Sequence, residues 1–308
     1  MAKDLRIIFM GTPDFAVASL DILVKNGFNV VGVITAPDKP AGRGLQLQES
    51  AVKKYAVANN LKVLQPEKLK NPAFIEELRA LKADLQVVVA FRMLPELVWD
   101  MPQEGTINVH ASLLPQYRGA APINWAIING EKVSGVTTFK LQHEIDTGDI
   151  LYSQEVPIRE DETAGELHDA LMHTGAELLL KTVKSIADGT AKGTPQKDVA
   201  PADIKHAPKI FKDTCKLDWQ KPIDQVYNLM RGLSPYPAAW TTFQSKTLKI
   251  YKAHKELTPP TVAPGEFETD QKTYLKIAAA DGWLVLDEIQ LEGKKRMGVV
   301  EFLRGYRF

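Results

Sequence analysis

Apolar positions in the first half of the chain form short, nearly continuous runs that alternate with segments of helical periodicity. The runs lie at residues 5–10, 30–35 and 84–90. Helical spacing of apolar side chains is found at residues 15–25, 50–60 and 73–81. Continuous apolar runs are typical of strands buried on both faces, whereas a period of three to four residues is typical of amphipathic helices. The strand–helix–strand order therefore predicts an α/β fold with a Rossmann-like parallel sheet and right-handed crossovers.

The middle of the chain continues this order and adds one long helix. Two further strands are predicted at residues 136–141 and 150–158. The loop between them contains Asp146. Residues 163–187 predict a helix, because Thr163 and Glu166 stand three residues apart at its start in a capping-box pattern.

Regular periodicity stops at residues 191–208, where Gly193 and three prolines stand among polar residues, and this composition predicts a linker. An amphipathic helix is predicted next, at residues 222–233. Short strands are predicted beyond it at residues 239–243, 248–253, 265–268, 275–279, 283–291 and 297–302. Several short strands with turn residues between them are typical of a small, OB-like β-barrel. We therefore expect an α/β domain at residues 1–190, the linker, and a β-barrel domain at residues 209–308.

Composition narrows the class of protein. The chain has 308 residues, 44% hydrophobic and 25% charged, which is the usual balance of a soluble globular protein. Its single cysteine, Cys215, excludes an intramolecular disulfide and a cysteine-based zinc site, and we expect no metal. No secretory signal is evident, and no stretch approaches the roughly 20 apolar residues that span a bilayer. We therefore expect a cytoplasmic protein with no membrane partner.

Charge is distributed unevenly although the net charge is zero. Residues 205–308 contain 17 Lys and Arg against 12 Asp and Glu, whereas the preceding 204 residues contain 21 against 26. A mildly basic C-terminal part is able to meet the phosphates of a nucleic acid. The alternative interpretation is an ordinary solvated surface, and charge counts alone leave both open.

Candidate chemistry lies at the end of a short predicted strand, in the run Asn108-Val109-His110. Side chains alternate between the faces of a strand, so Asn108 and His110 share one face. An amide and an imidazole side by side can hold a carbonyl oxygen that becomes negative during acyl transfer. A carboxylate from the following loop, Asp146, is able to orient the imidazole or collect a proton. The alternative is that His110 is an ordinary packed histidine, and spacing alone does not decide between the two.

Two nucleotide-dependent classes are not supported by the sequence. The first predicted strand runs into Gly11-Thr12-Pro13, without the Gly-x-Gly-x-x-Gly pattern that lets a pyrophosphate approach the backbone. We therefore expect no nicotinamide cofactor. The chain also lacks a Walker-type Gly-Lys-Ser/Thr loop, so nucleotide hydrolysis has no support.

Residues 105–151 resemble the signature of the folate-dependent formyltransferases. The resemblance implies 10-formyltetrahydrofolate as formyl donor and a catalytic set of Asn108, His110 and Asp146. It also implies that a Ser-Leu-Leu-Pro turn contacts the folate. In this chain the turn consists of Ser112, Leu113, Leu114 and Pro115.

Within that family the chain is similar to the members that formylate methionyl-tRNA. The similarity rests on residues 8–16, on the loop at residues 36–44, and on the β-rich C-terminal segment. It implies initiator methionyl-tRNA as acceptor and partner, with Lys39 and Arg43 near the tRNA; no protein partner is implied. Two departures stand out: the loop continues with Leu45-Gln46-Leu47-Gln48 where relatives often carry lysines, and the junction at residues 211–219 differs upstream of its Asp-Trp pair.

The resemblance also implies a mechanism. Asn108 and a protonated His110 donate hydrogen bonds to the developing oxyanion, while Asp146 orients the imidazole and helps to move the proton of the attacking amine. Three alternatives remain open at this point: a sugar-nucleotide formyltransferase, a formyltetrahydrofolate hydrolase, and a tRNA-binding module without activity. The dependence of the reaction on the acceptor distinguishes all of them.

Overall fold

The computed structural model describes residues 4–41, 46–196 and 200–308. Contacts divide the described chain into two compact units. The first unit comprises residues within 1–118, 134–156 and 168–205, and the second comprises residues 119–133, 157–167 and 206–308. Each unit therefore contains segments that are far apart in the sequence.

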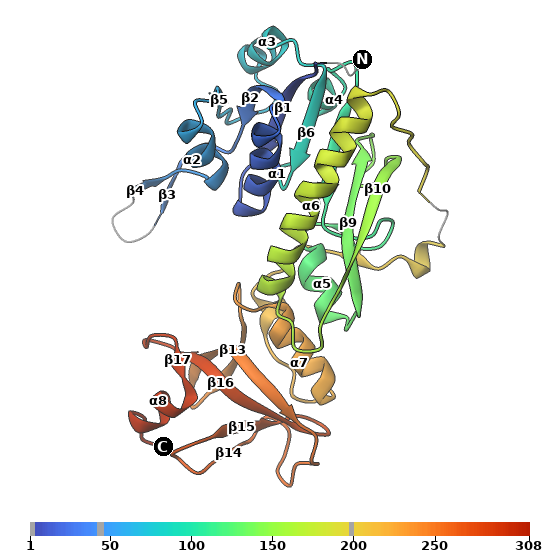
Figure 1. Ribbon diagram of the computed structural model, residues 1–308. Helices are drawn as coiled ribbons and strands as arrows, with labels where there is room; N and C mark the ends of the chain where they lie inside the picture. The colour runs from blue at the N-terminus through green and yellow to red at the C-terminus, as the bar shows by residue number, and fades with distance from the viewer. Residues whose placement is uncertain (1–3, 42–45, 197–199) are drawn as a thin grey trace. The chain divides into compact units, whose positions relative to one another are not determined.

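A seven-stranded sheet forms the centre of the first unit (Figure 1). Its strands, in spatial order, are β10 (Ile150–Pro157), β9 (Val133–Lys140), β7 (Thr106–His110), β6 (Leu85–Val89), β1 (Arg6–Gly11), β2 (Asn29–Ile34) and β5 (Val63–Leu64). Strand β7 pairs parallel with β6, as do β6 with β1, β1 with β2 and β2 with β5. Strand β9 pairs antiparallel with β7. The predicted parallel sheet is therefore confirmed over five strands, and β9 makes the whole sheet mixed.

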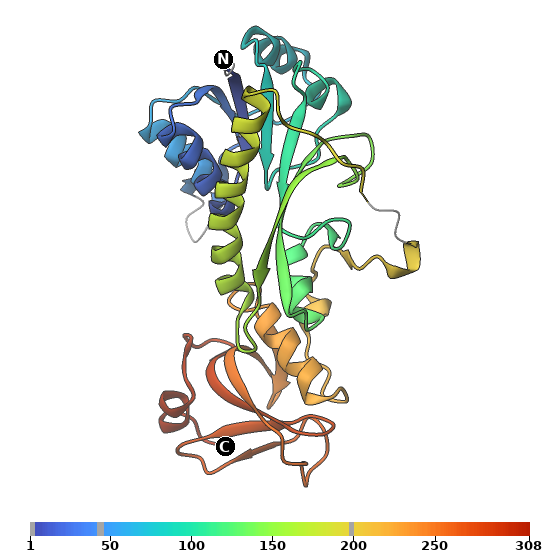
Figure 2. The same ribbon diagram turned by 45° about the vertical axis from the view of Figure 1, so that its right-hand side comes forward.

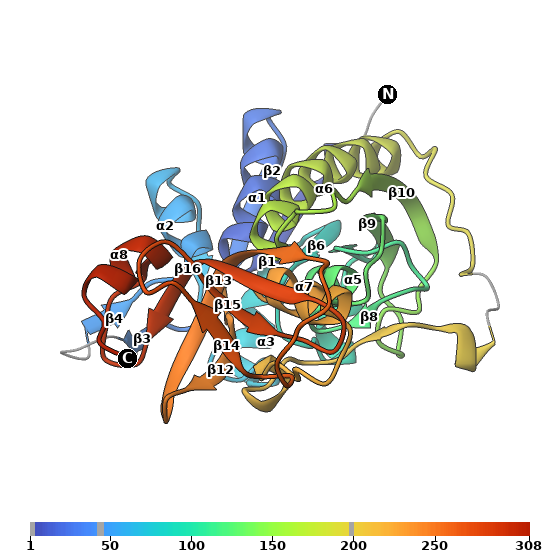
Figure 3. The same ribbon diagram turned by 90° about the horizontal axis from the view of Figure 1, so that it is seen from below.

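Helices cover both faces of this sheet. They are α1 (Asp14–Lys25), α2 (Ala51–Ala58), α3 (Pro72–Ala80), the short α4 (Glu96–Trp99) and α6 (Ala164–Ala187). Helices α1 and α6 lie on one face and α3 on the other (Figures 1 and 3). The rings of Phe15 on α1 and His168 on α6 are 5.3 Å apart. The predicted capping box is confirmed, since the Thr163 N–H donates to Glu166 Oε2 at 2.9 Å and the Glu166 N–H donates to Thr163 Oγ1 at 3.3 Å.

Register brings the carboxyl ends of three parallel strands to one edge of the sheet. Gly11 of β1 is level with Val89 of β6, and Val89 is level with Val109 of β7. The turn from β1 into α1 requires a glycine here, because a β-carbon on Gly11 would lie 2.6 Å from Ala16 Cβ and 2.9 Å from the Val89 carbonyl oxygen. Ligands of open α/β sheets bind beyond this edge, and His110 lies at it.

An antiparallel sheet forms the core of the second unit. Its strands follow the order β12 (Ala239–Phe243), β13 (Lys246–Glu256), β16 (Trp283–Leu291), β15 (Leu275–Ala278) and β14 (Phe267–Thr269), and β17 (Met297–Gly298) pairs with β16. Among the residues that the structure describes, no pairing joins β12 to β14, so the sheet is an open half-barrel. Helix α7 (Ile223–Gly232) packs on it through Ile223, Val226 and Met230, which share one buried cluster with Ile250 and Leu284 (Figure 2).

The remaining elements are short. They are the hairpin strands β3 (Lys39–Ala41) and β4 (Gln46–Gln48), strands β8 (Arg118–Gly119) and β11 (His206–Ala207), helices α5 (Pro122–Ile128) and α8 (Val299–Arg304), and 3-10 turns at Pro201–Asp203 and Asp213–Cys215. The β3–β4 hairpin, strand β5 and helix α4 were not predicted from the sequence, since each is too short to show a period.

The strand predicted at residues 297–302 is wrong beyond Gly298, because helix α8 begins at Val299. Val299, Phe302 and Leu303 are buried at 7%, 2% and 3% exposure. Their spacing of three and four residues is helical, and all three join the core of the half-barrel. The two adjacent valines favoured the strand interpretation, but burial of one helical face decides the structure.

Core packing of the first unit makes a direct prediction for its stability. Phe9 of β1 is 0% exposed, so its truncation in Phe9→Ala leaves a cavity in a close-packed interior. The free energy of unfolding, measured by urea denaturation, should fall by roughly 3–5 kcal/mol. The control Val57→Ala, at a position that is 57% exposed, should change it by less than about 0.5 kcal/mol. Equal effects of the two substitutions would contradict this account of the core.

Candidate active site

Strand β7 places the two candidate donors side by side. Asn108 is level with Val88 of β6 on one side and with Phe139 of β9 on the other, so the strand is held by both neighbours. Ile107 is 0% exposed and Asn108 only partly buried. Within the part of the chain that the structure describes, the Asn108 amide has no hydrogen-bond partner. Its donors are therefore free for a ligand.

The His110 ring is held at one nitrogen by the backbone. Nε2 lies 2.9 Å from the carbonyl oxygen of Tyr117. A carbonyl oxygen only accepts hydrogen bonds, so Nε2 carries the hydrogen and donates it. Tyr117 has a φ of 59°, in the left-handed region, and is itself fixed by a 2.6 Å hydrogen bond from its N–H to the Lys205 carbonyl oxygen. Nδ1 is therefore the ring nitrogen that remains for chemistry.

Asp146 faces that second nitrogen. Its Oδ2 lies 4.0 Å from His110 Nδ1, and the two side chains are only 11% and 8% exposed. A carboxylate only accepts hydrogen bonds, so Asp146 presents an acceptor to a hydrogen carried on Nδ1. The sequence predicted that His110 and Asp146 act together, and the structure brings them together across about 36 residues of chain.

The loop that carries Asp146 has a constrained backbone. Asp146 adopts a φ of 56°, a left-handed conformation that Asp tolerates better than most residues. Two residues later, a β-carbon on Gly148 would lie 1.6 Å from the Lys140 carbonyl oxygen, so only glycine fits against β9. The Lys140 N–H also donates to the Asp149 carbonyl oxygen at 3.0 Å. The loop is therefore pressed against the end of β9.

The turn at residues 112–115 is built around a buried serine. The Ser112 hydroxyl, on a residue 1% exposed, donates to the Gln116 carbonyl oxygen at 2.7 Å. Thr137 on β9 ties the turn to the sheet: its hydroxyl donates to the Ser112 carbonyl oxygen at 2.7 Å and accepts from the Leu114 N–H at 3.2 Å. The Leu114–Pro115 bond is cis. Ser112 thus orders the turn, while Leu113 and Pro115 are the partly exposed members.

Lys39, one of the two residues predicted to meet tRNA, belongs to strand β3, which with β4 extends away from the sheet of the first unit in Figure 1. Lys39 is exposed on β3, whereas Arg43 lies outside the described residues. Asp38, at the base of the hairpin, accepts hydrogen bonds from Lys53 Nζ at 2.5 Å and from Gln65 Nε2 at 2.8 Å. These hydrogen bonds, that of Lys53 first, lower the pKa of Asp38. The hairpin therefore leaves the sheet from an ion-paired base.

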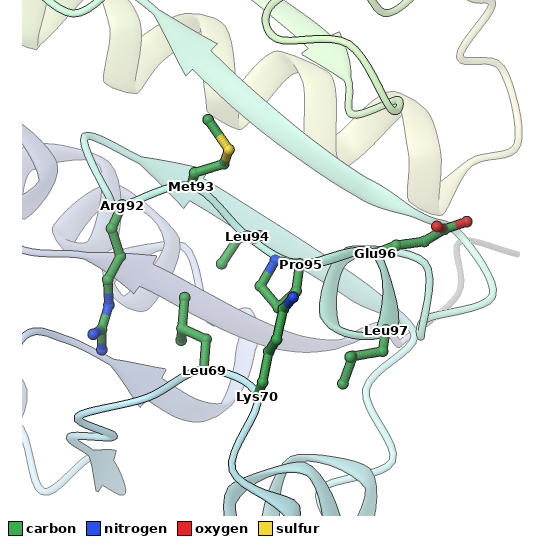
Figure 4. Close-up of a pocket in the computed structure, with 8 residues that line it drawn as sticks. All are labelled: Leu69, Lys70, Arg92, Met93, Leu94, Pro95, Glu96 and Leu97. Carbon is green, nitrogen blue, oxygen red and sulfur yellow. The ribbon is translucent and has the colours of Figure 1, made fainter.

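A pocket of about 720 Å³ opens beside helix α4 (Figure 4). It is lined by Leu69, Lys70, Arg92, Met93, Leu94, Pro95, Glu96 and Leu97. Arg92 is turned toward the preceding loop, where its Nη1 donates to the Glu67 carbonyl oxygen at 2.8 Å. Burial lowers the pKa of Arg92. None of the predicted site residues lines this pocket.

Comparison with known proteins decides the family. The Formyl transferase model matches residues 5–183, and the model for the C-terminal domain of formyl transferases matches residues 209–307. Methionyl-tRNA formyltransferase of Parabacteroides distasonis is 57% identical over 99% of this chain and 97% of its own. The enzyme of the same name from Bacteroides fragilis is 54% identical over 99% and 96%. The chain belongs to the methionyl-tRNA formyltransferase family.

Solved structures agree with this membership at the level of fold. An N-formyltransferase from Helicobacter canadensis, in complex with folinic acid and dTDP-3-aminofucose, aligns with a TM-score of 0.69 over 92% of this chain and 98% of its own, at 23% identity. HypX from Aquifex aeolicus, in complex with tetrahydrofolic acid, gives a TM-score of 0.65 over 98% of this chain and 47% of its own, at 19% identity. The predicted fold class is thereby confirmed.

Two further findings bear on ligands and membranes. Outside the three undescribed segments, no group of three or more His, Cys, Asp or Glu side chains is arranged to hold a metal ion. No helix in the described chain has the length and apolarity needed to cross a bilayer.

Two residues of the site were not assigned by sequence reasoning. Tyr117 contributes its backbone carbonyl, and a backbone contribution leaves no signature in residue type. Gln196 stands in the segment predicted as a linker, yet its Nε2 donates to the Asp146 carbonyl oxygen at 2.7 Å and to that of Gly148 at 3.0 Å. Only the fold shows that this polar residue follows the Asp146 loop.

Proposed function

We propose that this chain transfers a formyl group from 10-formyltetrahydrofolate to the α-amino group of the methionine carried by initiator tRNA. The observation that carries the proposal is 57% identity to a methionyl-tRNA formyltransferase over 99% of the chain. The site supports it independently, since His110 and Asp146 face each other beside the free amide of Asn108. The same activity belongs to translation initiation in the cytoplasm.

The geometry suggests a role for each of the three side chains. As the amine attacks the formyl carbon, the carbonyl oxygen gains negative charge; Asn108 and the Nδ1–H of a protonated His110 are the donors that stabilise it. Asp146 orients the ring and accepts the proton that the amine loses. The bond from the formyl carbon to N10 of the folate then breaks, and N10 takes up the proton that Asp146 accepted from the amine. No covalent enzyme intermediate is needed.

We further propose how the chain divides this work. Residues 1–190 form the formyltransferase domain, and residues 191–208 are the linker. Residues 209–308 bind tRNA through the cationic excess noted above, together with Lys39 and Arg43 of the hairpin. In the folate turn, Leu113 and Pro115 offer a partly exposed apolar surface, and the buried Ser112 and Leu114 keep that surface in place.

The first test is formyl transfer to methionyl initiator tRNA from 10-formyltetrahydrofolate, with methionyl elongator tRNA, an amino-sugar nucleotide, and no acceptor in parallel. We expect product with the initiator tRNA. Formate release without acceptor would indicate a hydrolase, and transfer only to the amino sugar would indicate a sugar-nucleotide formyltransferase. Each of those two results would refute the proposal.

His110→Ala and Asp146→Ala should each lower turnover by roughly 100- to 1000-fold, because each removes a charged partner from the stabilised transition state. Single-turnover transfer with excess enzyme measures the loss, and circular dichroism checks the fold. His173→Ala, at an exposed position on α6, is the matched control and should keep wild-type turnover. A His110→Ala or Asp146→Ala enzyme with more than about a tenth of wild-type turnover would contradict these roles.

Arg43→Ala should raise the KM for tRNA by about tenfold and leave folate binding unchanged, since a phosphate contact acts on the nucleic acid alone. The effect should shrink as salt rises, because a neutralised phosphate releases counterions. Lys62→Ala, a change of another exposed cation in the same unit, is the control. Equal losses of tRNA and folate binding in Arg43→Ala would show that the loop acts on the whole fold instead.

A further inference from the structure

The Asp146 loop lies along a segment that sequence periodicity assigns to a linker. Thr194 pairs with Ile150 at the start of β10 through two hydrogen bonds of 2.8 Å. One residue earlier, a β-carbon on Gly193 would lie 2.9 Å from Asp149 Cβ, so the Gly193 backbone packs closely against the Asp149 side chain. Residues 193–196 therefore follow the loop from its far end toward Asp146.

Gln196 is the side chain in this segment that reaches the catalytic end of the loop. Its Nε2 donates to the carbonyl oxygens of Asp146 and Gly148, at 2.7 and 3.0 Å. Its Oε1 accepts from Arg118 Nη2 at 2.6 Å. Since a guanidinium only donates, Arg118 fixes which end of the amide faces it, and the NH₂ group must point at the loop.

This contact acts on a residue in the left-handed backbone region. A non-glycine residue at a φ of 56° needs surrounding structure to keep it there. Gln196 holds the carbonyl of Asp146 and that of Gly148 together, so it fixes the peptide units that follow the Asp146 side chain. The direction of that side chain sets its 4.0 Å approach to His110 Nδ1.

We propose that Gln196 is a positioning residue for formyl transfer, which holds the 146–148 loop so that the Asp146 carboxylate faces His110. The inference rests on the proposed function, because it acts through the catalytic pair assigned there. Gln196 touches neither donor nor acceptor in this account. Its effect is exerted on the geometry of Asp146 alone.

Kinetics of three variants test the role. Gln196→Ala removes the whole contact, and Gln196→Glu keeps an acceptor for Arg118 but no donor for the loop. Both should lower kcat about tenfold, with KM for folate and for tRNA within about threefold, because a displaced catalytic group affects the transition state more than substrate binding. Gln154→Ala changes an exposed glutamine on β10 whose side-chain amide donates to the adjacent Glu155 carbonyl oxygen, and it should match wild type.

A double-mutant cycle separates positioning from general destabilisation. If Gln196 works through Asp146, then Gln196→Ala should cause no further loss of single-turnover rate in an Asp146→Ala background. A multiplicative loss, or a loss confined to KM for tRNA, would overturn the proposal. So would a lowered melting temperature with unchanged kcat.

A spectroscopic readout decides the inference even if the chain does not formylate tRNA. With ¹⁵N-labelled histidine, the His110 ring signals are assigned by their disappearance in His110→Asn. Gln196→Ala should shift those signals in the same direction as Asp146→Ala does, and Gln154→Ala should leave them in place. Unchanged His110 signals in Gln196→Ala would refute the positioning role, whereas an inactive wild type with shifted signals would refute only the proposed function.

Discussion

The hydrogen bond from His110 Nε2 to the Tyr117 carbonyl oxygen is the interaction on which the site depends. It assigns one ring nitrogen to the backbone and leaves Nδ1 for Asp146 and a substrate. The bond exists because Tyr117 takes a left-handed conformation just after the 112–115 turn, and because Thr137 ties that turn to the sheet. The orientation of a side chain on β7 is thus set by seven residues of backbone that follow it.

The opposing carboxylate is held by the backbone of its loop together with the Gln196 side chain, which donates to the Asp146 and Gly148 carbonyl oxygens. Gly148 packs against the Lys140 carbonyl oxygen, the Lys140 N–H bonds to the Asp149 carbonyl oxygen, and Thr194 pairs with Ile150. Backbone hydrogen bonds of this kind can be formed by every residue type, whereas the close approach at Gly148 requires a glycine. His110 and Asp146 therefore meet as a consequence of loop geometry. The 112–115 turn is tied to β9 through Thr137, and the Asp146 loop is tied to β9 through Lys140.

Sequence patterns predicted the parts of this structure whose causes are local. The capping box of Thr163 and Glu166 is a contact between neighbours, and apolar runs mark strands that are buried on both faces. The strand prediction for residues 297–302 was wrong because their apolar side chains fit both a strand and a helix period. Only packing against the half-barrel core selects the helix from Val299 onward. The β3–β4 hairpin was not predicted because its strands pair over only three residues, which is too few to show a hydrophobic period.

The residues of the candidate site likewise fall into those that the sequence could name and those that only the fold reveals. Asn108, His110 and Asp146 could be named because the family motif specifies side chains, and the structure brings His110 and Asp146 within 4.0 Å of each other. Gln196 could not be named from the sequence. Its neighbours Pro195 and Gly193 mark the segment as irregular, and no period relates it to Asp146 fifty residues earlier. An irregular segment is therefore not a uniform spacer: the stretch that includes Thr194 and Gln196 is bound to the catalytic loop in register, so its length between those residues is constrained, whereas nothing comparable constrains a flexible tether.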